Sequence, residues 1–313
     1  MVFEDAPYNV KIDGHVRGLG KTKHREFAMA AGEMTQAEFQ AFLATNLRAL
    51  LPHLVDGAVV EMCMDWRHAL ELQLAMAEAG LEQINLAVWI KSNGGMGSLL
   101  RSQHELVFIG KHGKASPINN VQLGRFERYR TNVWRYPGVN TFGRGRMEQL
   151  SAHPTPKPVP LVADAIRDVT HRGQIVLDGF MGSGTTLLAA ERTERIAYGI
   201  DLHASYVDVA ILRCQAMTGQ EARLEISGQT FAEVKAERQQ DLPIDDVLPF
   251  SHPLISRVLG CQDALAGGVA QPAWQHRRAS ARLSRYAAAH GCSRRASCAA
   301  PTAHGSKMRT ASR

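Results

Sequence analysis

The sequence has few cysteines, and their spacing supports neither a disulfide framework nor a zinc site. Five cysteines occur among 313 residues, an odd number, and no two of them form a C-x-x-C pair. This usage excludes a small disulfide-stabilised secreted domain and is typical of a reducing cytoplasm. The 13 histidines are scattered without the spacing of metal ligands, so we expect no metal.

A long hydrophobic run is also missing. No apolar stretch approaches the roughly 18 residues that a membrane span needs, although 45% of the residues are hydrophobic. The first residues, MVFEDAPYNV, have neither the basic nor the apolar region of a signal peptide. With 21% charged residues the composition is ordinary for a globular protein. We therefore expect a cytoplasmic protein that does not bind a membrane.

Acidic residues are absent after Asp263. Residues 264–313 carry nine arginines and lysines, and subtracting nine from the formal charge of +6 leaves −3 for residues 1–263. We expect residues 241–313 to be a linker and a basic disordered tail, because this part has few apolar anchors and no period. The tail either binds nucleic acid or is an appendage without function. A second basic region, residues 111–157, has nine positive charges against Glu127 and Glu148, and it favours an anionic partner.

Strands and helices alternate through the rest of the chain. Hydrophobic periodicity and turn residues predict strands over 2–4, 57–64, 84–91, 105–111, 174–178 and 196–201. They predict helices over 66–79, 159–169, 184–193 and 205–217, and one more that begins at the capping box formed by Thr35 and Glu38. Residues 112–152 show no regular period. This alternation predicts an α/β fold with a mostly parallel, twisted sheet.

The segment VLDGFMGSGTT (176–186) predicts a strand, a glycine-rich turn and a helix. Its pattern is one residue short of a phosphate-binding loop, because Thr185 stands where the lysine would reach the phosphates. Asp201 ends the next strand, and a carboxylate at that position suits the two hydroxyls of a ribose; the alternative is that it only caps a helix. A glycine-rich turn, followed by a carboxylate that can bind a ribose and lacking a phosphate-binding lysine, suits an adenosyl cofactor without phosphates. S-adenosylmethionine is such a cofactor.

A second group, Asp5-Ala6-Pro7-Tyr8, follows the first strand, at the sheet edge where α/β proteins bind ligands. Together with residues 176–201 it resembles the β class of amino-group DNA methyltransferases, whose motifs are D-P-P-Y and D-P-F-x-G-S-G-T-T. The segments HPTPKPV (153–159) and WIKSNGGMGSLLRSQHELVFIGKHG (89–113) are similar to family segments. RTNVWRYPGVNTF (130–142) resembles a bacterial subgroup that is often fused to a ParB-like domain, which this sequence does not contain.

The resemblance implies a Rossmann-like S-adenosylmethionine-dependent methyltransferase fold with helices on both faces of the sheet and a permuted motif order. The methyltransferase domain would be residues 1–240: a catalytic half (1–111), a target-recognition segment (112–152) and a cofactor half (153–240). The activity would move a methyl group to the exocyclic amino group of a flipped-out base in double-stranded DNA. Adenine N6 is favoured because Asp5 opens the motif, whereas serine is usual in the cytosine enzymes. The protein would then be nucleoid-associated.

The resemblance also implies roles for individual residues. In the catalytic motif, the Asp5 carboxylate and the Ala6 carbonyl would accept the two amino hydrogens, Pro7 would hold the segment rigid, and Tyr8 would stack on the base. The residues implied to bind the cofactor are Thr155, Lys157, Pro158, Asp178, Phe180, Gly182, Ser183, Gly184, Thr185 and Asp201. Basic residues interleaved with aromatics suit DNA, and the arginines implied to contact it are Arg125, Arg128, Arg130, Arg135, Arg144 and Arg146. The alternative is that these aromatics form a small core and the arginines a solvated face.

Three departures from the family motifs leave other functions open. Ala6 and Gly179 replace prolines, and Asp201 replaces the more common glutamate; only four residues precede Asp5. Each change keeps the functional group, but the two lost prolines loosen the backbone. The alternatives are an impaired methyltransferase that only binds cofactor or DNA, and an RNA or small-molecule amine methyltransferase on the same fold. Methylation of cytosine carbon is excluded, since no cysteine follows a proline. A cognate restriction endonuclease is a further implied partner, and the sequence leaves the oligomeric state open.

Overall fold

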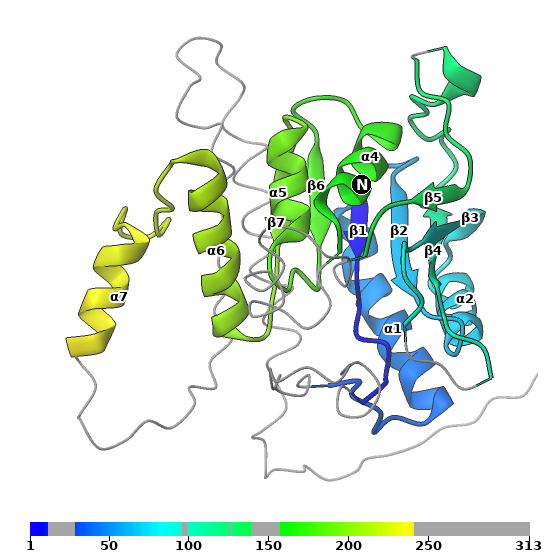
Figure 1. Ribbon diagram of the computed structural model, residues 1–313, viewed down its shortest axis with the longest axis horizontal. Coiled ribbons are helices and arrows are strands. Elements are labelled where there is room, and N and C mark those ends of the chain that lie inside the picture. Colours follow the sequence, from blue (N-terminus) through cyan, green and yellow to red (C-terminus); the bar gives the residue numbers. More distant parts are fainter. Residues whose placement is uncertain (12–28, 96–98, 126, 139–156, 241–313) are drawn as a thin grey trace, which may run out of the picture.

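The computed structural model describes residues 1–11, 29–95, 99–125, 127–138 and 157–240 (Figure 1). Within them, seven strands form one sheet. The strands are β1 (Val2–Glu4), β2 (Val59–Met64), β3 (Glu82–Ile90), β4 (His104–Lys111), β5 (Val133–Arg135), β6 (Ile175–Asp178) and β7 (Ile196–Gly199). The helices are α1 (Gln36–Leu50), α2 (Ala69–Glu78), α4 (Val159–Val169), α5 (Thr185–Arg192), α6 (Ala204–Thr218) and α7 (Phe231–Gln240), with short 3-10 turns at η1 (Leu51–His53) and η2 (Gln122–Gly124).

The sheet brings the two sequence motifs together at its centre. Its strand order is β5-β3-β4-β2-β1-β6-β7. Only β4 is antiparallel to its neighbours, and the other adjacent pairs are parallel. Because β1 lies between β2 and β6, the catalytic motif after β1 and the glycine turn after β6 leave the sheet at the same edge. The predicted mostly parallel α/β fold is confirmed.

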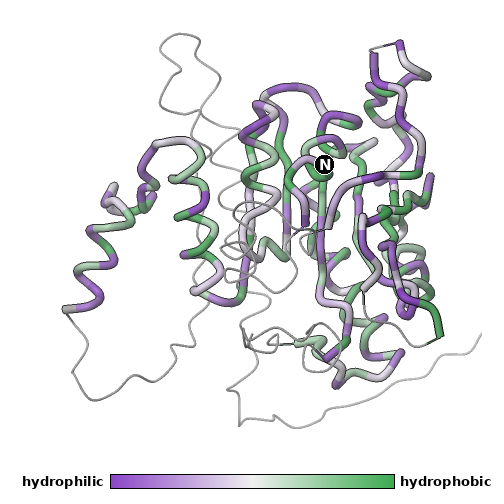
Figure 2. The backbone as a smooth tube through the Cα atoms, in the orientation of Figure 1, coloured by the Kyte–Doolittle hydropathy of each residue, from purple (hydrophilic) through white to green (hydrophobic). Residues whose placement is uncertain are grey.

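Helices cover both faces of the sheet, as predicted. On one face α1 and α2 pack Phe39, Leu43 and Leu72 against Val60 and Met62 of β2. The helices α4, α5 and α6 pack a second apolar cluster against the opposite face. Figure 2 shows hydrophobic stretches along the central strands and a largely hydrophilic α7, which lies outermost. Within the described ranges, no helix is both long enough and apolar enough to cross a membrane.

Local hydrogen bonds explain where two helices begin. The backbone N–H of Glu38 donates to Thr35 Oγ1 at 3.3 Å, and the backbone N–H of Thr35 donates to the Glu38 carboxylate at 2.9 Å, so the predicted capping box starts α1. The predicted helix over 66–79 begins later, at Ala69. The Asp65 carboxylate accepts hydrogen bonds from the backbone N–H groups of Arg67 and His68, which holds these residues in a turn.

Two elements were not predicted. The strand β5 lies inside the segment expected to be irregular, and its Val133 pairs with Val88 of β3. Three residues are too few to show a period, and only the neighbouring strand makes them a strand. The helix α7 has no apolar face to reveal it. The predicted tail and all of residues 139–156 lie outside the described residues.

Candidate active site

The catalytic motif folds back on itself directly after β1. Ala6 is 2% exposed, and the Asp5 side chain is 22% exposed. The Tyr8 hydroxyl lies within hydrogen-bond distance of two carboxylates, 2.9 Å from Asp5 Oδ1 and 3.1 Å from Glu105 Oε2 of β4, and its one hydrogen can point to either. Asn9 then turns the chain with a φ of 52°, and its side-chain oxygen accepts the backbone N–H of Gly32 at 3.0 Å. The motif therefore presents a half-buried carboxylate whose Oδ1 side is held by its own tyrosine.

Lys157 joins this carboxylate to a second one. Its ammonium lies 2.5 Å from Asp5 Oδ1 and 2.9 Å from Glu105 Oε2, and it donates to the Tyr8 hydroxyl at 3.0 Å. Glu105 is also ion-paired with Lys91 at the end of β3. The resemblance placed Lys157 in the cofactor site, but its ammonium is already bound by two protein carboxylates. The structure therefore places Lys157 beside Asp5, and its contact with the cofactor stays a prediction.

The charges of this cluster follow from burial and pairing. Burial acts against the charged form of Glu105, but the ammonium groups of Lys157 and Lys91 outweigh it and lower its pKa to about 2. Burial likewise acts to lower the pKa of Lys157, but Asp5 and Glu105 outweigh it and raise that pKa above its ordinary range. The pKa of Asp5 is raised, chiefly by burial, with Lys157 opposing and Glu105 adding to the shift. Of these three groups, Asp5 is the one whose protonation changes most readily.

The glycine turn after β6 is held by two aspartates. Asp178 accepts the backbone N–H of Phe180 at 2.9 Å and the Thr186 hydroxyl at 2.6 Å. Asp201, beyond β7, accepts the backbone N–H of Gly182 at 2.9 Å and that of His203 at 2.8 Å. Asp201 therefore links the glycine turn to the residue just before α6, but the N-cap of that helix is His203, which has no side-chain cap hydrogen bond, so the alternative role of Asp201 as a helix cap is not seen. Ribose binding by the same carboxylate stays a prediction.

The turn packs tightly against α6. Gly184 has a φ of 80°, and a Cβ built on it would lie 2.7 Å from the Cβ of Ala210. Ser183 Oγ accepts a hydrogen bond from Arg213 at 2.7 Å, while Thr185 is 8% exposed at the start of α5. A carboxylate beside a glycine turn, with threonine where a phosphate-binding lysine would be, fits a nucleoside group without phosphates. These residues therefore fit the predicted cofactor. Pro158, also implied to bind it, caps the start of α4.

Glu4 connects the catalytic strand to this turn, and the sequence analysis missed it. Its carboxylate is fully buried, accepting the backbone N–H of Gly179 at 3.1 Å and the side-chain amide of Asn46 at 2.7 Å. A proline at position 179, as in the family motif, has no N–H to donate. A Cβ on Gly179 would also lie 2.4 Å from Glu4 Oε1. The departure from the family motif is thus matched by a partner on β1.

Buried Glu4 makes stability depend on pH, and we expect the free energy of unfolding to fall as pH rises from about 5 to about 8. Burial, and next the charge of Asp178, raises the pKa of Glu4 from 4.5 to about 8. Between these values the folded chain keeps a proton that the unfolded chain has released, so this stability is full below the lower value and is lost as pH rises through the upper one. Chemical denaturation across this range should show a loss on the order of 4 kcal/mol, because each pH unit contributes about 1.4 kcal/mol.

Glu4→Gln should make that slope shallower. It should not become flat, because burial also raises the pKa of Asp178 to about 7 and that of Glu61 to about 8. An unchanged slope in Glu4→Gln would contradict the buried, proton-binding state of Glu4.

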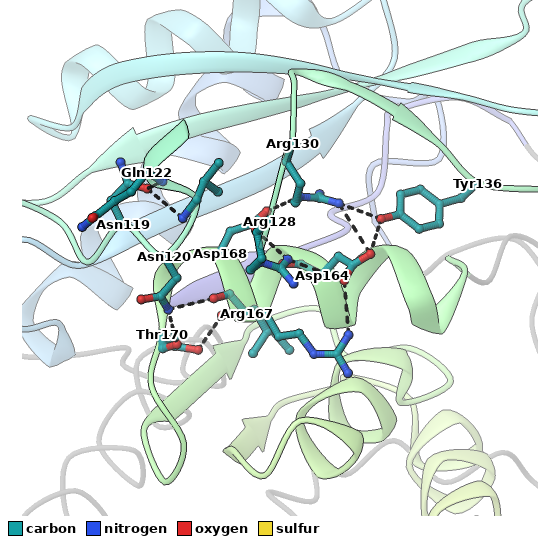
Figure 3. A network of polar contacts seen from close by, with 12 residues as sticks. Asn119, Asn120, Gln122, Arg128, Arg130, Tyr136, Asp164, Arg167, Asp168 and Thr170 are labelled. Carbon is teal, nitrogen blue, oxygen red and sulfur yellow. Dashed lines mark hydrogen bonds and ion pairs between the residues drawn. The ribbon is translucent and has the colours of Figure 1, made fainter. Parts of the chain in front are cut away.

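Two of the predicted DNA-contacting arginines are bound by α4 instead (Figure 3). Arg128 contacts Asp168 at 2.6 Å, and Arg130 contacts the other Asp168 oxygen at 2.5 Å. Both guanidinium groups also lie 3.5 Å from Asp164. These four residues, which we call the arginine clamp, fasten the recognition segment to the cofactor half. A guanidinium that is paired with two carboxylates is a poor phosphate ligand, so the structure gives these two arginines a role in the fold, and their contact with DNA stays a prediction.

The remaining predicted contacts are placed differently. Arg125 and Arg135 are exposed on the same segment and stay predicted DNA contacts. Arg144, Arg146 and the cofactor residue Thr155 lie outside the described residues. Tyr136 donates its hydroxyl to Asp164 at 2.5 Å, and the side-chain amide of Asn120 donates to the carbonyls of Arg167 and Thr170 (Figure 3). Trp134 is only 5% exposed and Tyr136 packs against the same core cluster, as the alternative for this segment expects of its aromatics, whereas Arg128 and Arg130 are ion-paired and form no solvated face.

Fold and site together define a Rossmann-like methyltransferase with its catalytic motif ahead of its cofactor motif. The DNA methylase family N6_N4_Mtase matches residues 1–212, more than half of the chain, and the protein belongs to this family. It is an S-adenosylmethionine-dependent DNA methyltransferase, and it modifies an exocyclic amino group, either adenine N6 or cytosine N4.

Individual relatives are more distant. The type II methyltransferase M.ScaI of Streptomyces caespitosus is 33% identical over 86 residues, which span 28% of this chain and only 28% of that protein. The type II methyltransferase M2.MboI of Moraxella bovis is 23% identical over 228 residues, which span 70% of this chain and 81% of that protein. Among solved structures, the cytosine-N4-specific PvuII DNA methyltransferase has a TM-score of 0.54 at 16% identity, covering 68% of this chain and 78% of that one. At that identity the likeness shows the fold alone.

Proposed function

We propose that this protein methylates adenine N6 in double-stranded DNA. The observation that carries the proposal is the carboxylate of Asp5, which lies at the carboxyl end of the central strand β1 beside the cofactor turn. Its Oδ1 is occupied by Tyr8 and Lys157. Among the described residues no donor binds Oδ2, so that oxygen can accept a hydrogen from a substrate amine.

The chemistry requires two acceptors, because the lone pair of an exocyclic amine is delocalised into the base. Hydrogen bonds from the two amino hydrogens to Asp5 Oδ2 and to the carbonyl of Ala6 would draw the nitrogen toward tetrahedral geometry. S-adenosylmethionine supplies an electrophilic methyl group when bound. As the carbon–nitrogen bond forms and the sulfur keeps the electrons of the bond that breaks, Asp5 would accept the proton that the nitrogen loses. Asp5 must be ionised for this step, so activity should rise with pH through its raised pKa.

The base itself would be held by the protein after leaving the helical stack. Tyr8 is half-buried beside Asp5, and the Lys157 ammonium lies 5.2 Å from its ring centroid. The aromatic ring of Tyr8 would stack on the flipped-out base. Exposed Arg125 and Arg135 would contact the DNA backbone from the recognition segment.

Modification-sensitive sequencing of DNA from cells that express the chain tests this proposal. We expect N6-methyladenine in one sequence context, and none in matched cells that express Asp5→Asn. If N4-methylcytosine is found and N6-methyladenine is not, the target of the enzyme is cytosine and the proposal of adenine is wrong. Unmodified DNA, together with cofactor binding by calorimetry, would indicate the impaired methyltransferase, and methyl transfer to RNA alone would indicate the RNA enzyme.

A further inference from the structure

Four charged side chains alternate in sign from the catalytic carboxylate into the fold. Asp5 contacts Lys157, Lys157 contacts Glu105, and Glu105 contacts Lys91. The first comes from the end of β1, the second from the entry to α4, the third from β4 and the fourth from the end of β3. Lys157 is only 5% exposed and Glu105 only 14%, so water does not screen these pairs strongly.

We infer that Lys157 and Glu105 are positioning residues for Asp5: the lysine binds Oδ1 and leaves Oδ2 for the substrate amine, and the glutamate holds the lysine in place. This inference rests on the proposed role of Asp5. The geometry supports it because the Lys157 ammonium, with three donors, contacts Asp5, Glu105 and the Tyr8 hydroxyl at 2.5, 2.9 and 3.0 Å. Both the carboxylate and the stacking tyrosine are therefore fixed by one buried cation.

Glu105 has a distinct task within the cluster. Lysine is flexible, and one partner would leave its ammonium free to rotate away from the reacting edge. Glu105 is held in turn by Lys91 on one oxygen, and on the other it accepts both Lys157 and Tyr8. The second carboxylate therefore orients the ammonium toward Asp5. Its negative charge nevertheless opposes ionisation of Asp5, so the two positioning residues act on Asp5 in opposite directions.

That opposition gives a test that a merely structural role would not pass. The titratable and charged groups that face Asp5 are Lys157 at the entry to α4, Glu105 on β4, Tyr8 in its own segment, Cys63 on β2 and Asp178 on β6. Removing the lysine charge in Lys157→Met should raise the pKa of Asp5 by roughly 1–3 units. Removing the glutamate charge in Glu105→Gln should lower it. Carbon-13 NMR of aspartate-labelled protein measures both, with the Asp5 signal assigned by its loss in Asp5→Asn.

Kinetics on the same variants separates positioning from cofactor binding. Lys157→Met should lower kcat by about 10²-fold, because a displaced acceptor no longer meets the amine, while cofactor affinity by calorimetry stays within threefold. Lys157→Arg keeps the charge and should restore part of kcat and the low Asp5 pKa. Lys111→Met is the matched control. Lys111 forms another lysine–glutamate pair, with its ammonium 2.9 Å from the Glu82 carboxylate. It lies at the opposite end of β4 from Glu105, about 20 Å away at ~3.3 Å per residue.

The outcomes are distinguishable. An Asp5 pKa that does not move in Lys157→Met, or a loss of cofactor affinity without that movement, would overturn the inference and return Lys157 to the cofactor site. If Lys157→Met does not fold, Glu105→Gln decides: an Asp5 pKa that does not move there overturns the inference, whereas a rise means that the lysine has left Asp5, which is the loss of the hold assigned to Glu105. If the parent protein transfers no methyl group to DNA but both NMR shifts occur, the proposed function fails while the positioning role stands.

Discussion

Asp5→Asn should lower kcat for methyl transfer to DNA by roughly 10²–10⁴-fold, the range for loss of an acid–base group. Asparagine keeps the size of the side chain but cannot take the proton that the substrate nitrogen loses. It also presents an amide in place of a carboxylate that Lys157 now binds at 2.5 Å. Cofactor affinity should stay within threefold, because the cofactor turn is held by Asp178 and Asp201. Single-turnover transfer of labelled methyl groups, with calorimetry of cofactor binding, measures the two quantities separately.

Asp65→Asn is the control for this variant. Asp65 follows β2, the strand next to β1, and its carboxylate contacts Arg67 at 2.7 Å. The same loss of one charge at the same sheet edge should therefore change kcat by less than threefold. If Asp5→Asn has the same kcat as the parent protein, Asp5 takes no part in the reaction. If Asp5→Asn and Asp65→Asn lose the same amount of kcat, Asp5 contributes only negative charge at this edge of the sheet.

Gly184→Ala should be the most damaging change in the cofactor half. Alanine at a φ of 80° costs about 1–2 kcal/mol, and its Cβ would lie 2.7 Å from the Cβ and 3.1 Å from the Cα of Ala210. Because one of these atoms belongs to the backbone of α6, which packs against α5, overpacking should add about 1–3 kcal/mol. Denaturant unfolding should show the sum, and cofactor affinity should fall more than tenfold because the glycine turn must shift.

Gly219→Ala separates the two causes. Gly219 ends α6 with a φ of 71°, yet nothing lies within 4 Å of an added Cβ. It should therefore lose only the backbone contribution and keep normal cofactor affinity. If the two alanine variants are equally stable, the close contact between the turn and α6 is not a constraint, and the requirement for glycine at 184 is conformational alone.

The parts of the site that can be predicted from the sequence are those whose residues are adjacent in the chain. The tetrapeptide at Asp5 and the turn at Gly182–Thr185 are contiguous, so their residue types carry the chemistry and their neighbours carry the strand and helix signals. The capping box at Thr35 is equally local, and the start of α1 was found correctly. The alternation of strands and helices predicts a parallel order, and a parallel order places both motifs at one edge of the sheet.

The parts that were not predictable depend on pairs far apart in the chain. Lys157 and Asp5 are 152 residues apart, and their contact requires the whole sheet to be in place. An acidic residue such as Glu4 is normally exposed, and only the missing proline at 179 hints at a buried acceptor. The arginine clamp left one usable signal. Asp164 and Asp168 are four residues apart, so they lie on one face of α4. Two carboxylates on one helix face predict positively charged partners packed against that face.

The arginine clamp sets boundaries for exchanging recognition segments between relatives. A graft that begins at 138 and ends before Lys157 keeps Arg128 and Arg130 and leaves the anchor on α4 intact. A graft that begins before Asn120 removes both arginines. Asp164 and Asp168 are then left as two like charges without their cations, and Asp168 is only 8% exposed. We expect chimeras with this longer graft to misfold where the donor segment meets α4, and not to fail through loss of DNA recognition. They should fold only if the donor segment supplies two cations that pair with Asp164 and Asp168.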